Sequence, residues 1–223
     1  MRCRLAMLLL GLLGTQQVAS QELHSHALAK PAAASPEEMD LSDKQWSFSA
    51  LGSFYFVPQD VDYFSPVLMA DYKSLHLEAR YNYEGIDAAS LWLGYNFSIG
   101  EKVKFDFTPM VGGIFGNTCG VAPGWRMALS AGKFELSSES EYVFDSRNSS
   151  DNFFYTWSEL RWHVMEWMSL GVAAQRSRTF ETHLDVQRGL LAGFTFKDVD
   201  FTFYVFNLGW EDPTFVVSVG INF

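Results

Sequence analysis

The sequence predicts an all-β protein, a closed antiparallel transmembrane β-barrel in which about twelve strands follow one another in an up-and-down meander. Three observations predict this fold. Segments of roughly ten residues alternate between apolar and polar side chains, the joints between them are alternately short and long, and aromatic residues gather near the segment ends. The chain has 223 residues, so one folded domain is expected.

The first 43 residues are expected to lie outside this domain. Residues 1–20 begin with Arg2 and Arg4, continue with an apolar run over 5–13 and end in small residues, the pattern of a signal peptide cleaved after Ser20. A membrane anchor is the alternative, but the run is well short of the ~20 residues that span a bilayer. Residues 21–43 are rich in proline and acid and predict a flexible periplasmic tail, and residues 44–223 form the barrel.

The strands are justified by alternation of period two, because successive side chains of a strand point to opposite faces. Residues 75–83 show it well: His76, Glu78 and Arg80 share one face, and leucine, alanine and tyrosine share the other. The same reasoning gives strands at 45–57, 66–72, 74–84, 89–98, 102–114, 125–131, 133–145, 153–164, 167–178, 183–196, 199–208 and 214–223.

Alternation alone would also fit a soluble β-sandwich or a soluble ligand-binding barrel. The joints after the even-numbered strands are tight, whereas most joints after the odd-numbered strands are longer and polar, as at 58–65, 116–124, 146–152 and 209–213. Short turns on one side and long loops on the other are typical of membrane barrels. Aromatic residues near both sets of ends predict two interfacial belts. Trp46 and Trp167 lie near the short turns, and Tyr55, Trp125, Tyr142 and Phe206 lie near the long loops.

The chain ends on Phe223 after an alternating strand that contains Val219 and Ile221. This ending resembles the C-terminal signature of bacterial outer-membrane β-barrels, whose assembly machinery recognises a last strand that ends in an aromatic residue. The resemblance implies location in the outer membrane of a Gram-negative-type bacterium. It implies outer-membrane lipid and the barrel-assembly machinery as partners, and a monomer is favoured.

Twelve strands are expected because 179 residues from position 45 give about fifteen per strand, enough for the ~9–11 that cross a membrane. Ten or eight longer strands are the alternatives if some tight joints are bulges. The first and last strands must pair, because an open sheet edge in hydrocarbon would leave backbone groups without partners.

If the apolar face meets lipid, the opposite face lines the lumen. A lipid-facing Arg or Lys at mid-bilayer would cost roughly 2–4 kcal/mol, which points the charged groups inward. The expected lining is acid-rich and consists of His76, Glu78, Arg80, Lys104, Asp106, Arg126, Glu135, Glu139, Glu141, Glu159, Arg161, His163, His183 and Asp185. The same parity places the rings of Tyr155 and Trp157 inside and Arg188 on the lipid face, where a bulge or a miscounted turn near Gly189 is expected.

Two functions follow from this lining. In the first, the lumen is a narrow passive channel that favours cations or neutral solutes, and the chain resembles small monomeric twelve-strand channels in length and pattern. In the second, charges such as Glu159 and Arg161 pair with Glu139, Glu141 or Arg80 and fill the lumen of a closed structural or surface-interaction barrel. The first is preferred, because twelve strands enclose more space than the ~8 whose side chains fill the interior.

Catalysis by an outer-membrane lipid hydrolase is the less favoured alternative. Such enzymes place a His-x-Ser pair on one strand, and none of the five histidines is followed by serine at that spacing. No cluster has metal-ligand spacing, so no metal or cofactor is expected. The net charge of −10 argues against a nucleic-acid partner. Cys119 falls in an expected loop and predicts a free, exposed thiol.

Overall fold

The computed structural model describes residues 46–58, 60–176, 186–209 and 212–223. These residues form one antiparallel sheet and a single short 3-10 helix, η1 (Ser149–Asp151). None of the helices in the described part of the chain is long and apolar enough to cross a bilayer. The strands are β1 (Ser47–Phe56), β2 (Tyr63–Tyr72), β3 (Leu75–Tyr81), β4 (Ala88–Tyr95), β5 (Phe97–Ile99), β6 (Val103–Gly116), β7 (Gly120–Ala131), β8 (Phe134–Asp145), β9 (Phe153–Met165), β10 (Met168–Arg176), β11 (Gln187–Phe196), β12 (Val199–Phe206) and β13 (Thr214–Asn222).

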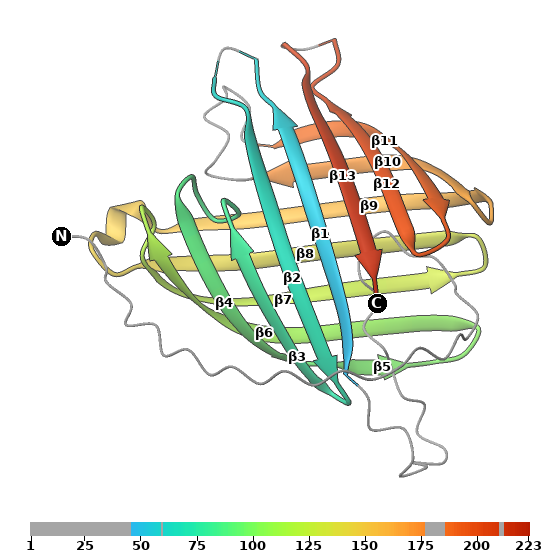
Figure 1. Ribbon diagram of the computed structural model, residues 1–223, viewed down its shortest axis with the longest axis horizontal. Coiled ribbons are helices and arrows are strands. Elements are labelled where there is room, and N and C mark those ends of the chain that lie inside the picture. The colour runs from blue at the N-terminus through green and yellow to red at the C-terminus, as the bar shows by residue number, and fades with distance from the viewer. Residues whose placement is uncertain (1–45, 59, 177–185, 210–211) are drawn as a thin grey trace.

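The sheet closes into a barrel of twelve strands (Figure 1). β4 and β5 count as one wall strand, because both pair with β6 and only Asn96 separates them. Each strand pairs with its neighbours in the chain, and β1 pairs with β13 from Ser49↔Asn222 to Phe56↔Phe215. Beyond this ladder, Phe48 and Phe223 exchange backbone hydrogen bonds of 3.1 and 2.9 Å. The predicted closure of first strand on last strand is therefore confirmed.

Each predicted strand range overlaps one strand of the wall, and the tight turns fall where they were expected. Lys73, Gly132 and Lys197 begin three of these turns with φ near +55 to +59°. Two-residue hairpins favour such left-handed conformations because they match the twist of the flanking strands.

The largest correction concerns β7, which begins at Gly120 and not at residue 125. The expected loop over 116–124 shrinks to a three-residue connection, because Gly120 to Gly124 pair with β6. Pro123 lacks an amide hydrogen, and the ladder between β7 and β8 is interrupted there. Cys119 is a free thiol as expected, but its side chain is buried and not exposed.

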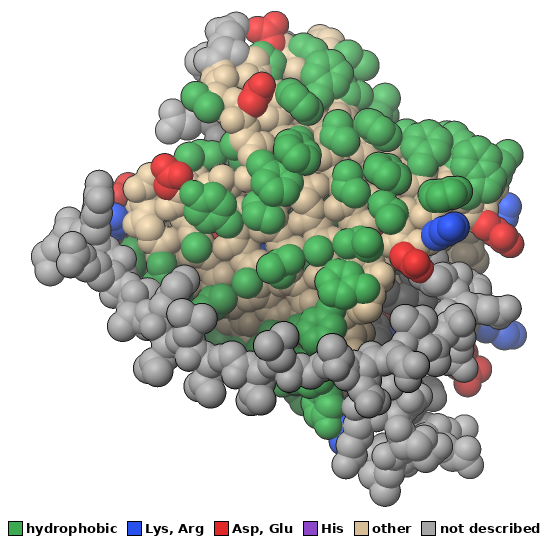
Figure 2. All heavy atoms as spheres, in the orientation of Figure 1, with side chains coloured by type: hydrophobic (Ala, Val, Ile, Leu, Met, Phe, Trp, Pro, Cys, Tyr) green, Lys and Arg blue, Asp and Glu red, His purple; other side chains and the backbone are tan. Residues whose placement is uncertain are grey.

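The outside of the barrel is apolar. On β4, Leu91 and Leu93 point outward and are 56% and 52% exposed, whereas Trp92 between them is 3% exposed. Figure 2 shows hydrophobic side chains across the visible outer wall, with charged side chains near its margins. An exposed apolar wall around a polar interior is the arrangement that a bilayer requires.

Two details of side-chain facing differ from expectation. Two aromatic residues near the long-loop ends point inward and do not join an interfacial belt: Tyr55 and Phe206 are buried in the interior. Tyr155 is buried there too, as parity predicted. Arg188 does lie on the outer face, but β11 pairs regularly with both neighbours there, so the expected bulge near Gly189 is absent. The shift of register described for β10 lies instead between Met168 and Ser169.

Candidate functional site

The barrel interior contains the charged side chains that alternation assigned to it. Of the fourteen predicted lining residues, His183 and Asp185 lie outside the described residues. Lys104, Arg126 and His163 are half-buried. The other nine are buried: His76, Glu78, Arg80, Asp106, Glu135, Glu139, Glu141, Glu159 and Arg161. Whether they line a conducting path stays a prediction.

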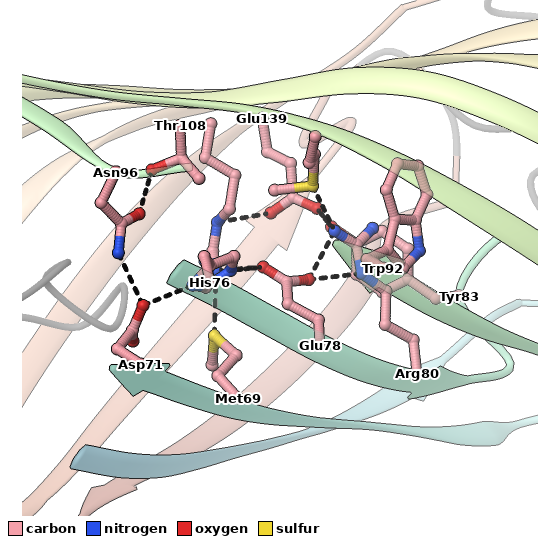
Figure 3. A network of polar contacts seen from close by, with 12 residues as sticks. Met69, Asp71, His76, Glu78, Arg80, Tyr83, Trp92, Asn96, Thr108 and Glu139 are labelled. Carbon is pink, nitrogen blue, oxygen red and sulfur yellow. Dashed lines mark hydrogen bonds and ion pairs between the residues drawn. The ribbon is translucent and has the colours of Figure 1, made fainter. Parts of the chain in front are cut away.

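Arg80 of β3 is the centre of the larger polar network (Figure 3). Its Nε donates to Glu78 Oε2 at 2.6 Å, its Nη2 lies 2.8 Å from Glu139 Oε1, and its Nη1 lies 3.1 Å from Glu141 Oε2. β3 and β8 are separated in the wall by β4, β6 and β7, so the pairs with Glu139 and Glu141 reach across the lumen. The side chain of Arg80 is 0% exposed.

Aromatic rings complete the surroundings of Arg80. The guanidinium carbon lies 4.4 Å from the ring centroid of Trp92 and 4.5 Å from that of Tyr83, distances typical of cation–π contacts. Trp92 can occupy this place because Gly112 faces it: a Cβ at position 112 would lie 2.4 Å from the indole. Three carboxylates and two rings thus fix one guanidinium, which presents donors in a planar fork.

The network continues from Glu78 toward the short-turn end of the barrel. Arg126 Nη1 lies 2.7 Å from Glu78 Oε1, and His76 Nε2 lies 2.6 Å from the same oxygen. His76 Nδ1 lies 2.7 Å from Asp71 Oδ1, so both ring nitrogens face carboxylates. Asn96 donates to Asp71 at 2.7 Å and accepts from Thr108 at 2.7 Å. This chain ties β2, β3, β6 and β7 to Asn96, the residue between β4 and β5.

A second, smaller network lies on β9 and β12. Arg161 Nε donates to Glu159 Oε2 at 2.6 Å, and Arg161 Nη2 donates to the hydroxyl of Tyr204 at 3.0 Å. Tyr204 and Trp157 both donate to Glu159 Oε1 at 2.7 Å. Arg161 lies against Gly193, where an added Cβ would be 2.9 Å from its Nη1. Glu159 and Arg161 were expected to pair with charged residues on β3 and β8, but the structure shows them paired with each other.

The interior is closely filled between and beyond these networks. Toward the long-loop end, two apolar clusters line the lumen, and Phe153 packs against both of them. One cluster includes Tyr55, Tyr155 and Trp157, and the hydroxyl of Tyr155 donates across the lumen to that of Tyr83 at 2.9 Å. A cavity of about 40 Å³ remains between Arg126, Glu139, Trp157 and Glu159. This is room for water, which needs about 10–15 Å³, and not for a sugar.

Several members of these networks were missed in the sequence analysis. Asp71, Asn96, Thr108 and Tyr204 face inward on their strands, so alternation could have found them. Glu84 ends the predicted strand over 74–84 on the same face as Arg80, so alternation could also have found it, although β3 itself ends at Tyr81. It is fully buried and contacts Ser90 and Trp92. Burial raises the pKa of the Glu84 carboxyl, although Arg80 and the hydrogen bonds from Ser90 and Trp92 act against this rise.

Carboxylates outnumber permanent cations in this interior. Glu84 Oε2 and Glu141 Oε1 are buried and have no hydrogen-bond partner among the described residues. In the same part of the chain, no group of three or more His, Cys, Asp or Glu side chains has the geometry to hold a metal ion.

Comparison with known proteins supports the fold. No protein-family model and no curated protein matches the sequence. A solved structure described as "KdgM porin in complex with disordered oligogalacturonate" is similar with a TM-score of 0.57 and 11% identity, over 79% of this chain and 99% of that chain. At this identity the similarity concerns the fold alone. The chain has the fold of a porin-like outer-membrane β-barrel.

Two further structures are less similar. The Acinetobacter baumannii outer membrane protein Omp33 has a TM-score of 0.45 and 10% identity, over 81% of this chain and 98% of that chain. The Salmonella typhi outer membrane phospholipase, a dimer with bound calcium, has a TM-score of 0.39 and 10% identity, over 79% of this chain and 89% of that chain. These scores are too low to support an inference.

Proposed function

We propose that the protein resides in the outer membrane of a Gram-negative-type bacterium and acts there as a narrow passive channel for small cations and uncharged solutes. The closed wall and its exposed apolar outer face support the membrane location. The similarity of fold to a porin supports a role in passage across that membrane.

The observation that carries the solute preference is the sign of the interior charge. The described interior contains four permanent cations, Arg80, Lys104, Arg126 and Arg161, against the carboxylates of Asp71, Glu78, Glu84, Asp106, Glu135, Glu139, Glu141, Glu159 and Asp200. Rings of carboxylates in a narrow pore attract cations and repel anions. The porin of similar fold is described with an oligogalacturonate, a polyanion, and the interior here disfavours such a ligand.

The pairs across the lumen set the width of this channel. Arg80 bridges β3 and β8 through Glu139, which also lines the cavity of about 40 Å³. We therefore expect conductance to be low while these pairs are intact and to rise when Arg80 is truncated.

A second candidate is a closed structural barrel without transport. The specific observation in its favour is the same filling: the two apolar clusters and the buried ion pairs leave little continuous space. Here the charges would serve only to pack the interior.

Single-channel recording in planar bilayers separates the two candidates. The purified barrel, checked for folding by heat-modifiable migration, is recorded in a KCl gradient as wild type and as Arg80→Ala. Arg147→Ala is the matched control, because Arg147 lies in the loop after β8 and its side chain is 43% exposed. Cation-selective steps that grow in Arg80→Ala and not in the control support the channel. Anion selectivity, or silence of both wild type and Arg80→Ala, would reject it.

A further inference from the structure

The outer wall of the barrel has a groove across β8 to β12. Its volume is about 610 Å³. Several of the outward-facing residues around it are exposed, among them Leu160, Val172, Leu190 and Leu208. Because these side chains face away from the lumen, the groove opens toward the bilayer and is separate from the interior networks.

The strand register explains why the wall is hollow at this place. Ser138 lies beside Ser158 and Ser158 beside Ala174, so small side chains adjoin one another on three neighbouring strands. One step nearer the short turns, larger residues form the rim of the groove: Leu136, Leu160, Val172, Leu190 and Val205 are partners across five strands. The hydroxyls of Ser138 and Ser158 lie 2.8 Å apart and satisfy each other. The floor can therefore accept a hydrocarbon chain without leaving a polar group unpaired.

The lining of the groove is mainly apolar: it includes Ser158 on the floor and Glu159, whose side chain is buried in the interior, and Arg188 lies at one end. Arg188 is the register partner of Ala174, points outward and is exposed. Arg176, the last residue of β10, also points outward, next to Thr156. The two arginines are diagonal neighbours on adjacent strands, about 7–8 Å apart. No ion pair among the described residues involves either of them, although an unpaired guanidinium beside hydrocarbon is costly.

An anionic lipid would satisfy this combination of shape and charge. A phosphate between Arg176 and Arg188 would receive charge-assisted hydrogen bonds, and guanidinium groups are well suited to it. An acyl chain from the same molecule would fill the adjacent groove. Both arginines lie at the long-loop ends of their strands, opposite the end where Phe48 pairs with Phe223. With the short turns in the periplasm, this end reaches the outer leaflet.

We propose that this groove is a binding site for a lipid of the outer leaflet that bears a phosphate and a net negative charge, with one acyl chain over Ser158 and Ala174 and the phosphate held by Arg188 and Arg176. The proposal rests on the membrane location given under "Proposed function" but not on conduction. A barrel that is electrically silent could bind the lipid, and a conducting barrel could fail to bind it.

The test is native mass spectrometry of the folded barrel in detergent with phosphatidylglycerol or phosphatidylcholine of identical acyl chains. We expect wild type to retain the anionic lipid about tenfold better, the order of one or two charge-assisted hydrogen bonds. Arg176→Gln/Arg188→Gln should lose this preference and Arg176→Lys/Arg188→Lys should keep most of it. Ala174→Leu should lower retention of both lipids by filling the groove. Arg147→Gln is the control and should match wild type.

Equal retention of the two lipids by wild type would overturn the proposal. An unchanged preference in the double glutamine variant, or unchanged retention in Ala174→Leu, would also do so. Cross-linking of a second copy of the chain through this face would assign the groove to self-association instead. Heat-modifiable migration of each variant ensures that a loss of lipid is read only from folded barrels.

Discussion

Truncation of Arg80 to alanine tests whether the interior network is held together in the way the geometry indicates. The variant removes the one cation that lies within 3.1 Å of Glu78, Glu139 and Glu141 at once. Arg126 still contacts Glu78 and Glu139, but Glu141 loses its partner. Removing one member of a buried ion pair costs about 3–5 kcal/mol, because the other charge is left without compensation.

We therefore expect Arg80→Ala to lower the free energy of unfolding by about 3–5 kcal/mol at neutral pH. The measurement is urea unfolding of the barrel in vesicles, followed by tryptophan fluorescence, to which Trp92 beside Arg80 contributes. The deficit should shrink as the pH is lowered, because protonation neutralises the carboxylates that the arginine compensated. Arg80→Lys should fall between wild type and Arg80→Ala, since an ammonium group keeps the charge but not the planar fork.

Arg147→Ala is the control for this experiment and should change the free energy of unfolding by less than about 0.5 kcal/mol, as surface substitutions usually do. A value for Arg80→Ala within the same limit would refute the reasoning. It would mean that the carboxylates around Arg80 are already protonated, or that water enters and solvates them.

Three further substitutions test other parts of the structure. Leu91→Arg places a charge on the outer wall of β4 and should lower the free energy of unfolding in vesicles by roughly 2–4 kcal/mol. Ile86→Arg in the neighbouring loop should lower it little, and equal losses would contradict the membrane-facing orientation of Leu91. Gly193→Ala should destabilise the barrel by about 1–3 kcal/mol in an unfolding titration, because the new Cβ would lie 2.4 Å from Ser169 Oγ and crowd Arg161. Gly220→Ala is the control, because the atoms nearest to its new Cβ would be 3.8 Å away. Phe223→Ala should reduce the fraction of heat-modifiable barrel in outer-membrane preparations more than Phe215→Ala does at the opposite end of β13. Equal fractions in the two variants would count against a C-terminal assembly signal that contains Val219, Ile221 and Phe223.

The strand pattern was predictable because alternation records a simple physical requirement. A strand between lipid and lumen must place apolar and polar side chains on opposite faces, and β3 and β4 do this along most of their length. The start of β7 was not predictable in this way. Glycines and Pro123 in that segment suggest a loop, but their backbones pair with β6. Glycine is present in this strand because some inward positions must be small: a Cβ on Gly124 would lie 3.1 Å from Glu141 and 3.2 Å from Trp92.

The candidate site was predictable in composition but not in connectivity. Parity gives the facing of Arg80, but it says nothing of reach across the lumen, so the contacts with Glu139 and Glu141 depend on barrel width and shape. Glu84 has the parity of Arg80 at the end of the predicted strand over 74–84, although the structure places it in a loop. The inward aromatic residues Tyr55 and Phe206 were misassigned because a ring near a strand end suits an interfacial belt and a lumen cluster equally well.

Two parts of the lumen are filled by different kinds of side chain, one by aromatic rings and one by ion pairs, and this difference bears on function. A twelve-strand barrel is wider than the ~8-strand barrels that side chains alone fill, so long or large residues must meet across it. Tyr155, Trp157 and Phe206 do this with rings near the long loops, and Arg80 and Arg126 do it with ion pairs to Glu139 and Glu78. Buried ion pairs are often no more stabilising than apolar residues of similar volume. The apolar clusters demonstrate that this wall can hold apolar residues of that size, so stability alone does not require the ion pairs. The path for small cations that we propose does require carboxylates, and this is a role for the network that packing does not supply.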